Sequence, residues 1–230
     1  MPIPSPYPRI VPRAVLFDWD NTLVDTWRSS YSALNFVLEQ YKLKTITADE
    51  FVKQPSVSMR DYFAKMFSKE EAERAEFMYY SFVREQHLNS LSPFPGTYNL
   101  LQWLMSKGIF AGVVSNKDGV VLRKEVEHLG WSKFFGQVIG SRDAEEDKPS
   151  PVPLLTALSR ENISAGHDVW FVGDSHIDMM CAQRALCVPV SISKEARIEG
   201  HPVVELNGCM ELAKLLSSLY NGTEKGAAIG

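Results

Sequence analysis

Residues Ala14–Asp25, AVLFDWDNTLVD, contain the pattern around which the rest of the chain can be interpreted. A short apolar run ends abruptly in two carboxylates, at Asp18 and Asp20. Such a run is typical of a buried strand with a functional carboxyl end. If the strand continued past Asp18, alternation would place both carboxylates on one side, where they would repel each other. A cation or a shared proton must then neutralise them, and oxygen ligands without nearby His or Cys favour Mg²⁺.

Length and composition limit the classes of protein that the chain can belong to. Its 230 residues are enough for one large core, or for a core with a smaller inserted domain. The net charge of −4 and the absence of a long basic stripe argue against a nucleic-acid partner. No apolar segment approaches membrane-spanning length, so no membrane partner is expected. The three cysteines lack CxxC spacing, which predicts reduced, buried thiols and a cytoplasmic location.

Both ends of the chain have the composition of tails. The N-terminal residues 1–12, MPIPSPYPRIVP, contain five prolines and no apolar segment, so they predict an extended or disordered tail and not a signal peptide. Residues 221–230 are small and polar, and we expect them to be a second flexible tail.

The region that follows the opening stretch, residues 26–92, has a helical pattern throughout. Two segments, Thr47–Glu50 and Ser68–Glu71, have the form of capping boxes, and each predicts the start of a helix. No strand pattern separates the helices, so we predict an inserted all-helical cap domain over 26–92. Apolar residues recur with helical spacing at Trp27, Tyr31, Leu34, Val37, Leu38 and Tyr41, and again at Ala72, Ala75, Met78, Tyr79, Phe82 and Val83.

Beyond Pro93–Gly96, strand and helix patterns alternate. This alternation predicts a parallel sheet covered by helices on both faces, an α/β fold of the Rossmann-like, three-layer type. Residues 1–25 and 93–220 would together form this core. The predicted strands lie at 109–114, 137–140, 169–172 and 188–192, and the predicted helices lie around 100–104, 120–129, 154–158 and 211–220.

Polar side chains follow the predicted strands, at the edge where open parallel sheets bind their ligands. Ser115 and Asn116 follow one strand, Asp174 and Asp178 follow another, and Lys148 lies at the start of a helix between them. Each residue type suits one task in phosphoryl transfer. The hydroxyl of Ser115, the backbone N–H of Asn116 and the Lys148 ammonium can hold phosphate oxygens, while Asp174 can ligate a metal with Asp178 supporting it.

The two aspartates of the opening stretch suit the chemical steps. Asp18 can attack phosphorus and form an aspartyl-phosphate, which divides a difficult hydrolysis into two easier steps. Asp20 can act as the general acid that protonates the leaving oxygen, and then accept a proton from the attacking water. The negative charge of phosphate requires an offsetting cation beside these carboxylates.

These motifs resemble those of the haloacid dehalogenase-like (HAD) hydrolases. DWDNTLVDT matches the family's first motif, Ser115 the second, Lys148 the third and Gly173–Asp178 the fourth, in the same order and over nearly the whole chain. The position of the insert resembles the helical C1 cap of the phosphoglycolate phosphatase-like and β-phosphoglucomutase-like branch. One departure is Asn21, where the family often has Gly; Asn is the next most tolerant of a positive φ.

The resemblance implies a Mg²⁺-dependent phosphatase that acts on a small phosphorylated metabolite, with phosphoglycolate as the leading candidate. It implies a metal site formed by Asp18, the backbone carbonyl of Asp20, Asp174 and Asp178. We expect a monomer or a homodimer.

Four alternatives stay open at this point. A dehalogenase would lack Asp20, because carbon–halogen cleavage needs no leaving-group proton, whereas a phosphomutase would keep it. A phosphonatase would need a Schiff-base lysine from the cap, and none stands out among Lys42, Lys44, Lys53 and Lys65. A regulatory binding protein that keeps the fold without catalysis is the fourth.

Several residues of the cap and the histidines are expected to be structural. The cap aromatics Trp27, Tyr31, Tyr79, Tyr80 and Phe82 are expected in the core of the cap and not in a substrate platform. Arg60 could reach a second anionic group of a substrate, but a surface position is favoured. The five histidines show no zinc spacing.

Overall fold

A six-stranded, all-parallel sheet forms the centre of the protein, in the order β5-β4-β1-β6-β7-β8. The computed structural model of the chain describes residues 10–54, 57–193, 196 and 203–227, with the side chains of 86 and 223–227 excepted. Most of the predicted N-terminal tail therefore lies outside the described residues. The strands are β1 (Ala14–Phe17), β4 (Phe110–Asp118), β5 (Gln137–Ser141), β6 (Val169–Gly173), β7 (Val188–Ser191) and β8 (Val204–Glu205).

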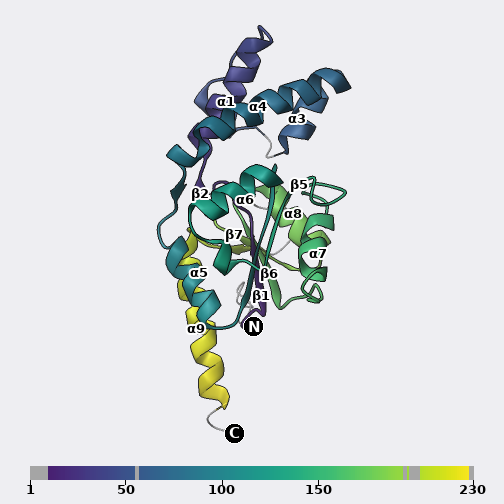
Figure 1. Cartoon of the computed structure of the whole chain (residues 1–230). Helices are drawn as coiled ribbons and strands as arrows, with labels where there is room; N and C mark the ends of the chain where they lie inside the picture. The colour runs from purple at the N-terminus through teal and green to yellow at the C-terminus, as the bar shows by residue number, and fades with distance from the viewer. Residues whose placement is uncertain (1–9, 55–56, 194–195, 197–202, 228–230) are drawn as a thin grey trace, which may run out of the picture.

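Helices cover both faces of this sheet (Figure 1). One hydrophobic cluster joins the sheet to α5 (Thr97–Ser106), α6 (Gly119–His128) and α9 (Cys209–Ala227). A second cluster joins the opposite face to α7 (Val152–Ser159) and α8 (His176–Arg184). The predicted α/β, Rossmann-like architecture is therefore confirmed. None of the described helices is both long and apolar enough to cross a membrane.

The elements differ in detail from the prediction. Strand β4 continues to Asp118, past the predicted end at Val114, although its register with β5 shifts between these two residues. The strand β8 and the 3₁₀ turn Ser132–Phe134 have too few residues for a periodic pattern to reveal them. Helix α9 includes residues 221–227 of the expected C-terminal tail. The three cysteines are buried free thiols, as predicted.

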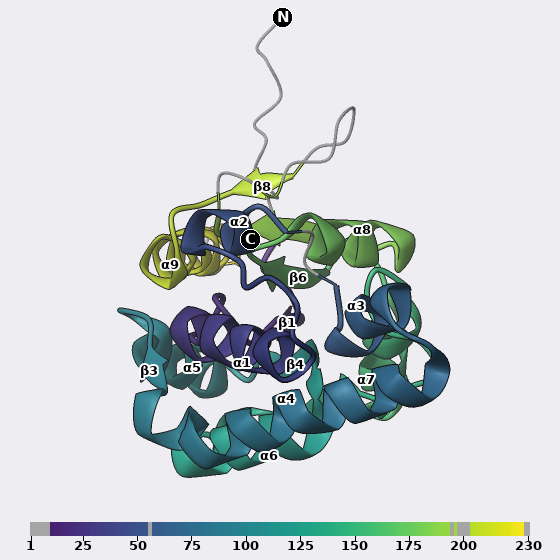
Figure 2. The same cartoon turned by 90° about the horizontal axis from the view of Figure 1, so that it is seen from above.

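The helices between β2 (Val24–Asp25) and β3 (Ser92–Pro93) form a layer above the sheet (Figures 1 and 2). It contains α1 (Trp27–Gln40), α2 (Ala48–Val52), α3 (Met59–Met66) and α4 (Lys69–Ser90). Its two connections to the rest of the chain pair as a short antiparallel ribbon, β2 with β3. Both predicted helix starts are present. The capping box at Thr47 is complete, whereas Ser68 precedes α4 without capping its backbone.

The helical layer has its own hydrophobic cluster, centred on α1, α3 and α4. This cluster includes Val121 of α6, so the helical layer packs against the helix α6 that covers the sheet. Two ion pairs also cross between the layers. Arg60 of α3 binds Asp147 at 2.7 Å, and Glu76 of α4 binds Arg142.

Candidate active site

The first site residue follows directly from the buried strand β1. Its side chains alternate between the two core clusters, with Val15 and Phe17 on one face and Ala14 and Leu16 on the other. Sheet pairing continues one residue further, because the Asp18 N–H donates to the carbonyl of Val172 at 2.8 Å. The Asp18 carboxylate is thereby fixed at the carboxyl end of a central strand.

The turn after Asp18 has the conformation that its sequence requires. Asn21 has φ of +57°, which confirms the expected positive φ at this position. The Asn21 N–H donates to the Val24 carbonyl at 2.8 Å and closes the turn. The buried hydroxyl of Thr22, in the same turn, lies 3.4 Å from carboxylate oxygens of both Asp18 and Asp174.

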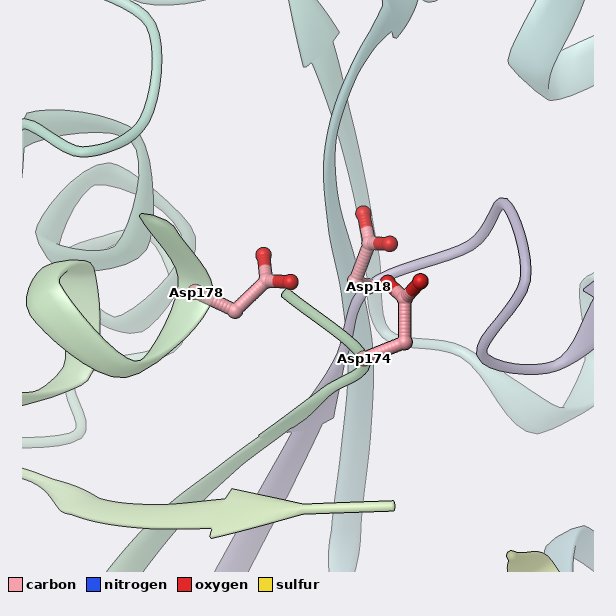
Figure 3. Close-up of side chains that lie close together, drawn as sticks. All are labelled: Asp18, Asp174 and Asp178. Atoms are coloured by element: carbon pink, nitrogen blue, oxygen red, sulfur yellow. The ribbon is translucent and has the colours of Figure 1, made fainter. Parts of the chain in front are cut away.

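Three carboxylates converge at this edge of the sheet (Figure 3). Asp18 follows β1, Asp174 follows β6, and Asp178 lies in the first turn of α8. One oxygen from each lies within 4.8 Å of the others. The Lys148 Nζ donates to Asp18 at 2.5 Å and to Asp178 at 2.7 Å. Tertiary structure therefore brings together residues that are up to 160 positions apart in the sequence (178 − 18).

Burial and mutual repulsion dominate the electrostatics of this cluster. Desolvation raises the pKa of Asp18 from 3.8 to about 7, with Lys148 opposing the rise and Asp178 and Asp20 adding to it. Desolvation, Asp178 and Asp18 likewise raise the pKa of Asp174 well above its usual value. Burial alone would lower the pKa of Lys148, but the carboxylates of Asp178 and Asp18 outweigh it and raise the pKa. Lys148 is therefore a fixed cation in an otherwise acidic site.

The cluster fits a magnesium ion. Three carboxylates share one ammonium group, and no described cation forms an ion pair with Asp174. All the candidate donors are hard oxygens, which Mg²⁺ prefers over zinc-type ligands. The Asp20 side chain is not part of this group of three carboxylates. The metal ligand expected from Asp20 is its backbone carbonyl, and this stays a prediction.

The predicted phosphate-binding residues lie at the same edge. Ser115 is buried, lines the cavity described below and accepts the N–H of Lys117 at 3.2 Å. The side-chain amide of Asn116 makes two 2.9 Å hydrogen bonds with the backbone N–H and carbonyl of Lys148. Asn116 therefore fixes the segment that carries Lys148, a task its position alone did not indicate.

A second buried lysine, Lys117, holds Asp20 and was missed by sequence reasoning. Its Nζ donates to Asp20 at 2.6 Å and to Glu125 at 2.8 Å. The Thr26 hydroxyl also donates to Asp20, at 2.6 Å. Desolvation would lower the pKa of Lys117, but Asp20 and Glu125 raise it overall. The only available signal was its place directly after Ser115 and Asn116.

Glu125 connects this lysine to the helical layer. Its carboxylate accepts the indole N–H of Trp19 at 2.6 Å and lies 2.7 Å from Nδ1 of the buried His87 on α4. Burial raises the pKa of Glu125, but Lys117 and the hydrogen bonds from His87 and Trp19 lower it overall. The expectation that the histidines are structural agrees with His87.

A cavity of about 670 Å³ lies between the sheet edge and the helical layer. Asp18, Asp20, Ser115, Lys148 and Asp174 line its floor. Its upper wall comes from the helical layer and is mainly aromatic and apolar. Tyr79 and Tyr80 belong to the hydrophobic cluster of that layer, as expected, and they also line the cavity. Trp27 lines the cavity and lies outside that cluster. The cap lysines Lys42, Lys44, Lys53 and Lys65 are exposed, and none of them lines the cavity.

Comparison with known proteins identifies the family. Residues 15–190 match the model of the haloacid dehalogenase-like hydrolases. The chain is 31% identical over 177 residues to the phosphoglycolate phosphatase of Xanthomonas campestris pv. campestris, covering 76% of this chain and 80% of that protein. It is 30% identical over 173 residues to the pyrophosphatase PpaX of Oceanobacillus iheyensis, covering 75% and 79%.

Comparison with solved structures supports the same family. A HAD-superfamily hydrolase from Ehrlichia chaffeensis is 30% identical with a TM-score of 0.65, covering 92% of this chain and 98% of that one. A haloacid dehalogenase-like family hydrolase from Streptococcus pneumoniae is 19% identical with a TM-score of 0.73, covering 90% and 98%, which shows the shared fold. The chain thus has an α/β, Rossmann-like fold with an acidic site at the sheet edge. It belongs to the haloacid dehalogenase-like hydrolases.

Proposed function

We propose that the protein is a Mg²⁺-dependent phosphatase that hydrolyses a small phosphomonoester through an aspartyl-phosphate on Asp18. The convergence of Asp18, Lys148 and two further carboxylates at the floor of a cavity is the observation that carries this proposal. The names of the relatives, phosphoglycolate phosphatase and pyrophosphatase, support phosphoester or phosphoanhydride chemistry. Phosphoglycolate is the candidate substrate that these names suggest.

The first step transfers the phosphoryl group to the enzyme. An oxygen of Asp18 attacks phosphorus as the bond from phosphorus to the leaving oxygen breaks. Lys148 positions Asp18, while the Ser115 hydroxyl and the backbone N–H of Asn116 hold phosphate oxygens. Asp20 gives its proton to the leaving oxygen, and the alcohol departs.

The second step releases phosphate. Asp20, now ionised, accepts a proton from a water molecule that attacks phosphorus. The bond between phosphorus and Asp18 breaks and restores the carboxylate. Asp18, Asp174, Asp178 and the carbonyl of Asp20 would hold Mg²⁺, which supplies positive charge to offset the repulsion between phosphate and the carboxylates.

The helical layer has a role in this proposal. Residues 26–92 act as a cap domain on a core formed by 1–25 and 93–220, and the cap limits access of water to the phosphoenzyme. The ribbon β2–β3 forms the connection between the two parts. The proposed substrate is a small metabolite of the cytoplasm, and the proposed enzyme is a monomer or a homodimer.

The test is hydrolysis of 4-nitrophenyl phosphate with Mg²⁺ and after removal of divalent ions by chelation. We expect turnover only with the metal, and release of free phosphate. Trapping with borohydride should reduce a phosphorylated Asp18, which mass spectrometry of the peptide would locate. Conversion of a hexose phosphate to its isomer without phosphate release would replace the phosphatase assignment by a phosphomutase. Absence of both activities would favour a binding protein.

A further inference from the structure

The cavity has room for a leaving group larger than the two-carbon group of phosphoglycolate. Its volume of about 670 Å³ lies within the range that encloses a drug-sized molecule. The floor takes the phosphate, which leaves most of the space to the group that departs. The chemistry of the cap wall must therefore decide which leaving group binds.

The described part of the cap offers no cation to a second anionic group. The lysines that line the cavity are Lys117 and Lys148, and each already binds two carboxylates. Arg60 binds Asp147 and does not line the cavity. His176 borders the cavity from the start of α8, on the core side.

The acidic groups of the site make binding of a second anionic group still less favourable. Asp18, Asp20, Asp25 and Asp174 all line the cavity. A carboxylate on the leaving group would thus lose its water and face like charges without an opposite charge. An unpaired charge in such a position costs far more free energy than a neutral group of the same size.

The cap wall instead offers flat apolar surfaces and uncharged polar groups, which are hydroxyls and the Gln54 amide. Trp27 and Phe51 line the cavity and are held by Tyr31, which stacks on Trp27 with ring centroids 5.4 Å apart and meets Phe51 edge-on at 5.7 Å. Aromatic side chains in such a fixed cluster bind planar or apolar groups. The Ser29 Oγ at this wall is buried and has no hydrogen-bond partner among the described residues.

From this wall we infer that the substrate is a phosphomonoester with an uncharged, largely apolar leaving group of at least aromatic-ring size. The inference rests on the proposed phosphatase function, and it replaces phosphoglycolate, which the relatives' names suggest, by a different class of substrate. We expect acids to be rejected because no cation among the described lining residues is left for a second anion, and rings to be preferred because the wall is aromatic.

Two matched pairs of substrates test it with the wild-type protein and Mg²⁺. Benzyl phosphate is compared with 4-carboxybenzyl phosphate, and 2-hydroxyethyl phosphate with 2-phosphoglycolate. We expect kcat/KM to favour the uncharged member of each pair by about 10-fold or more, and benzyl over hydroxyethyl phosphate. Equal or better turnover of the carboxylates would overturn the inference while leaving the phosphatase proposal intact.

Two variants of one cap residue test whether the leaving group lies against the cap wall. Gln54 lines the cavity from the cap, so Gln54→Arg would place a cation there, while Gln54→Met keeps the size without the charge. We expect Gln54→Arg to shift the ratio of the benzyl pair towards the carboxylate by about 10-fold, and Gln54→Met to leave the preference for the uncharged member. An unchanged ratio in Gln54→Arg would contradict the placement of the leaving group against the cap.

A binding readout separates the two proposals. Binding of the same pairs to Asp18→Asn is measured by calorimetry. If no phosphomonoester is hydrolysed by the wild type, the phosphatase proposal fails, but tighter binding of the uncharged members would still support the inference. Binding without that preference, or no binding, would overturn it.

Discussion

Asp18 and Asp20 are separated by one residue, yet they belong to different electrostatic environments. Asp18 faces Lys148, Asp174 and Asp178, and its side chain is 9% exposed. Asp20 faces Lys117 and Thr26 on another side of the cavity floor, and its side chain is 27% exposed. Each aspartate thus has its own buried lysine, and each lysine has a second carboxylate partner, Asp178 or Glu125.

One short segment can therefore supply two carboxylates with different ion-pair partners. The lysine beside Asp18 holds a carboxylate within an acidic cluster, as a nucleophile beside a metal requires. The ion pairs around Asp20 involve a different lysine from those of the cluster and reach His87 in the helical layer through Glu125. The position of Asp20, the proposed general acid, is therefore linked through Lys117 and Glu125 to the helical layer.

The largest expected effect is the loss of activity when Asp18 is replaced. Asp18→Asn removes the nucleophile, so kcat for aryl phosphate hydrolysis should fall on the order of 10³-fold or more. The matched control is Asp168→Asn, which changes the same group in the half-exposed ion pair with Arg13 and should keep wild-type kcat. Substantial turnover by Asp18→Asn would remove Asp18 as the nucleophile.

The next effect isolates the proton transfer assigned to Asp20. Asp20→Asn should lower kcat about 10²- to 10⁴-fold for an alkyl phosphate, whose leaving oxygen needs a proton. The loss should be much smaller for the first step with 4-nitrophenyl phosphate, because that leaving group departs as an anion. Burst kinetics of 4-nitrophenol release would show this. Equal losses in the first step for both substrates would contradict the role of Asp20 as the general acid.

A smaller effect concerns the lysine that holds Asp20. Lys117→Met should lower kcat about 10- to 100-fold with little change in KM, as expected when a group that orients an active-site residue is lost. It should also destabilise the fold, because Glu125 would stay buried without its cation.

The double variant Lys117→Met/Glu125→Gln separates these two consequences. It should recover thermal stability because the fully buried charge of Glu125 is removed as well, but kcat should stay low because Asp20 still lacks its partner. Recovery of kcat together with stability would show that Lys117 is only structural.

The smallest effect is the pH dependence of stability without metal. Folding raises the pKa of Asp18 from 3.8 to about 7, so the folded state holds a proton that the unfolded state has released. This contribution is fully present below pH 3.8 and is lost as the pH rises towards 7. Denaturant unfolding with chelator should therefore show a free energy of unfolding that falls more across this window for wild type than for Asp18→Asn. Parallel pH profiles would contradict the raised pKa.

The sequence predicted much of this site because its residues follow recognisable strands. The run before Asp18 and the run before Asp174 are buried strands, and parallel strands place their carboxyl ends at one edge. The positive φ at Asn21 and the capping box at Thr47 depend on adjacent residues, so local sequence was sufficient for both.

The parts that were missed depend on contacts between distant segments. Lys117 and Glu125 lie on a strand end and a helix, where a charged residue ordinarily faces solvent. They are buried together because α4 and Trp19, which follows β1, pack against them. The same holds for the cavity wall. Helical spacing places Trp27 and Tyr79 on apolar faces, but it cannot show that these faces border a cavity.

Local periodicity and residue spacing were sufficient to predict the α/β fold, the inserted helices and the set of acidic and basic residues at the strand ends. Tertiary structure alone decided which lysine binds which aspartate and what chemistry the cap presents to a leaving group. Ion pairing and burial depend on distances across the whole fold, and a linear pattern carries no such distances.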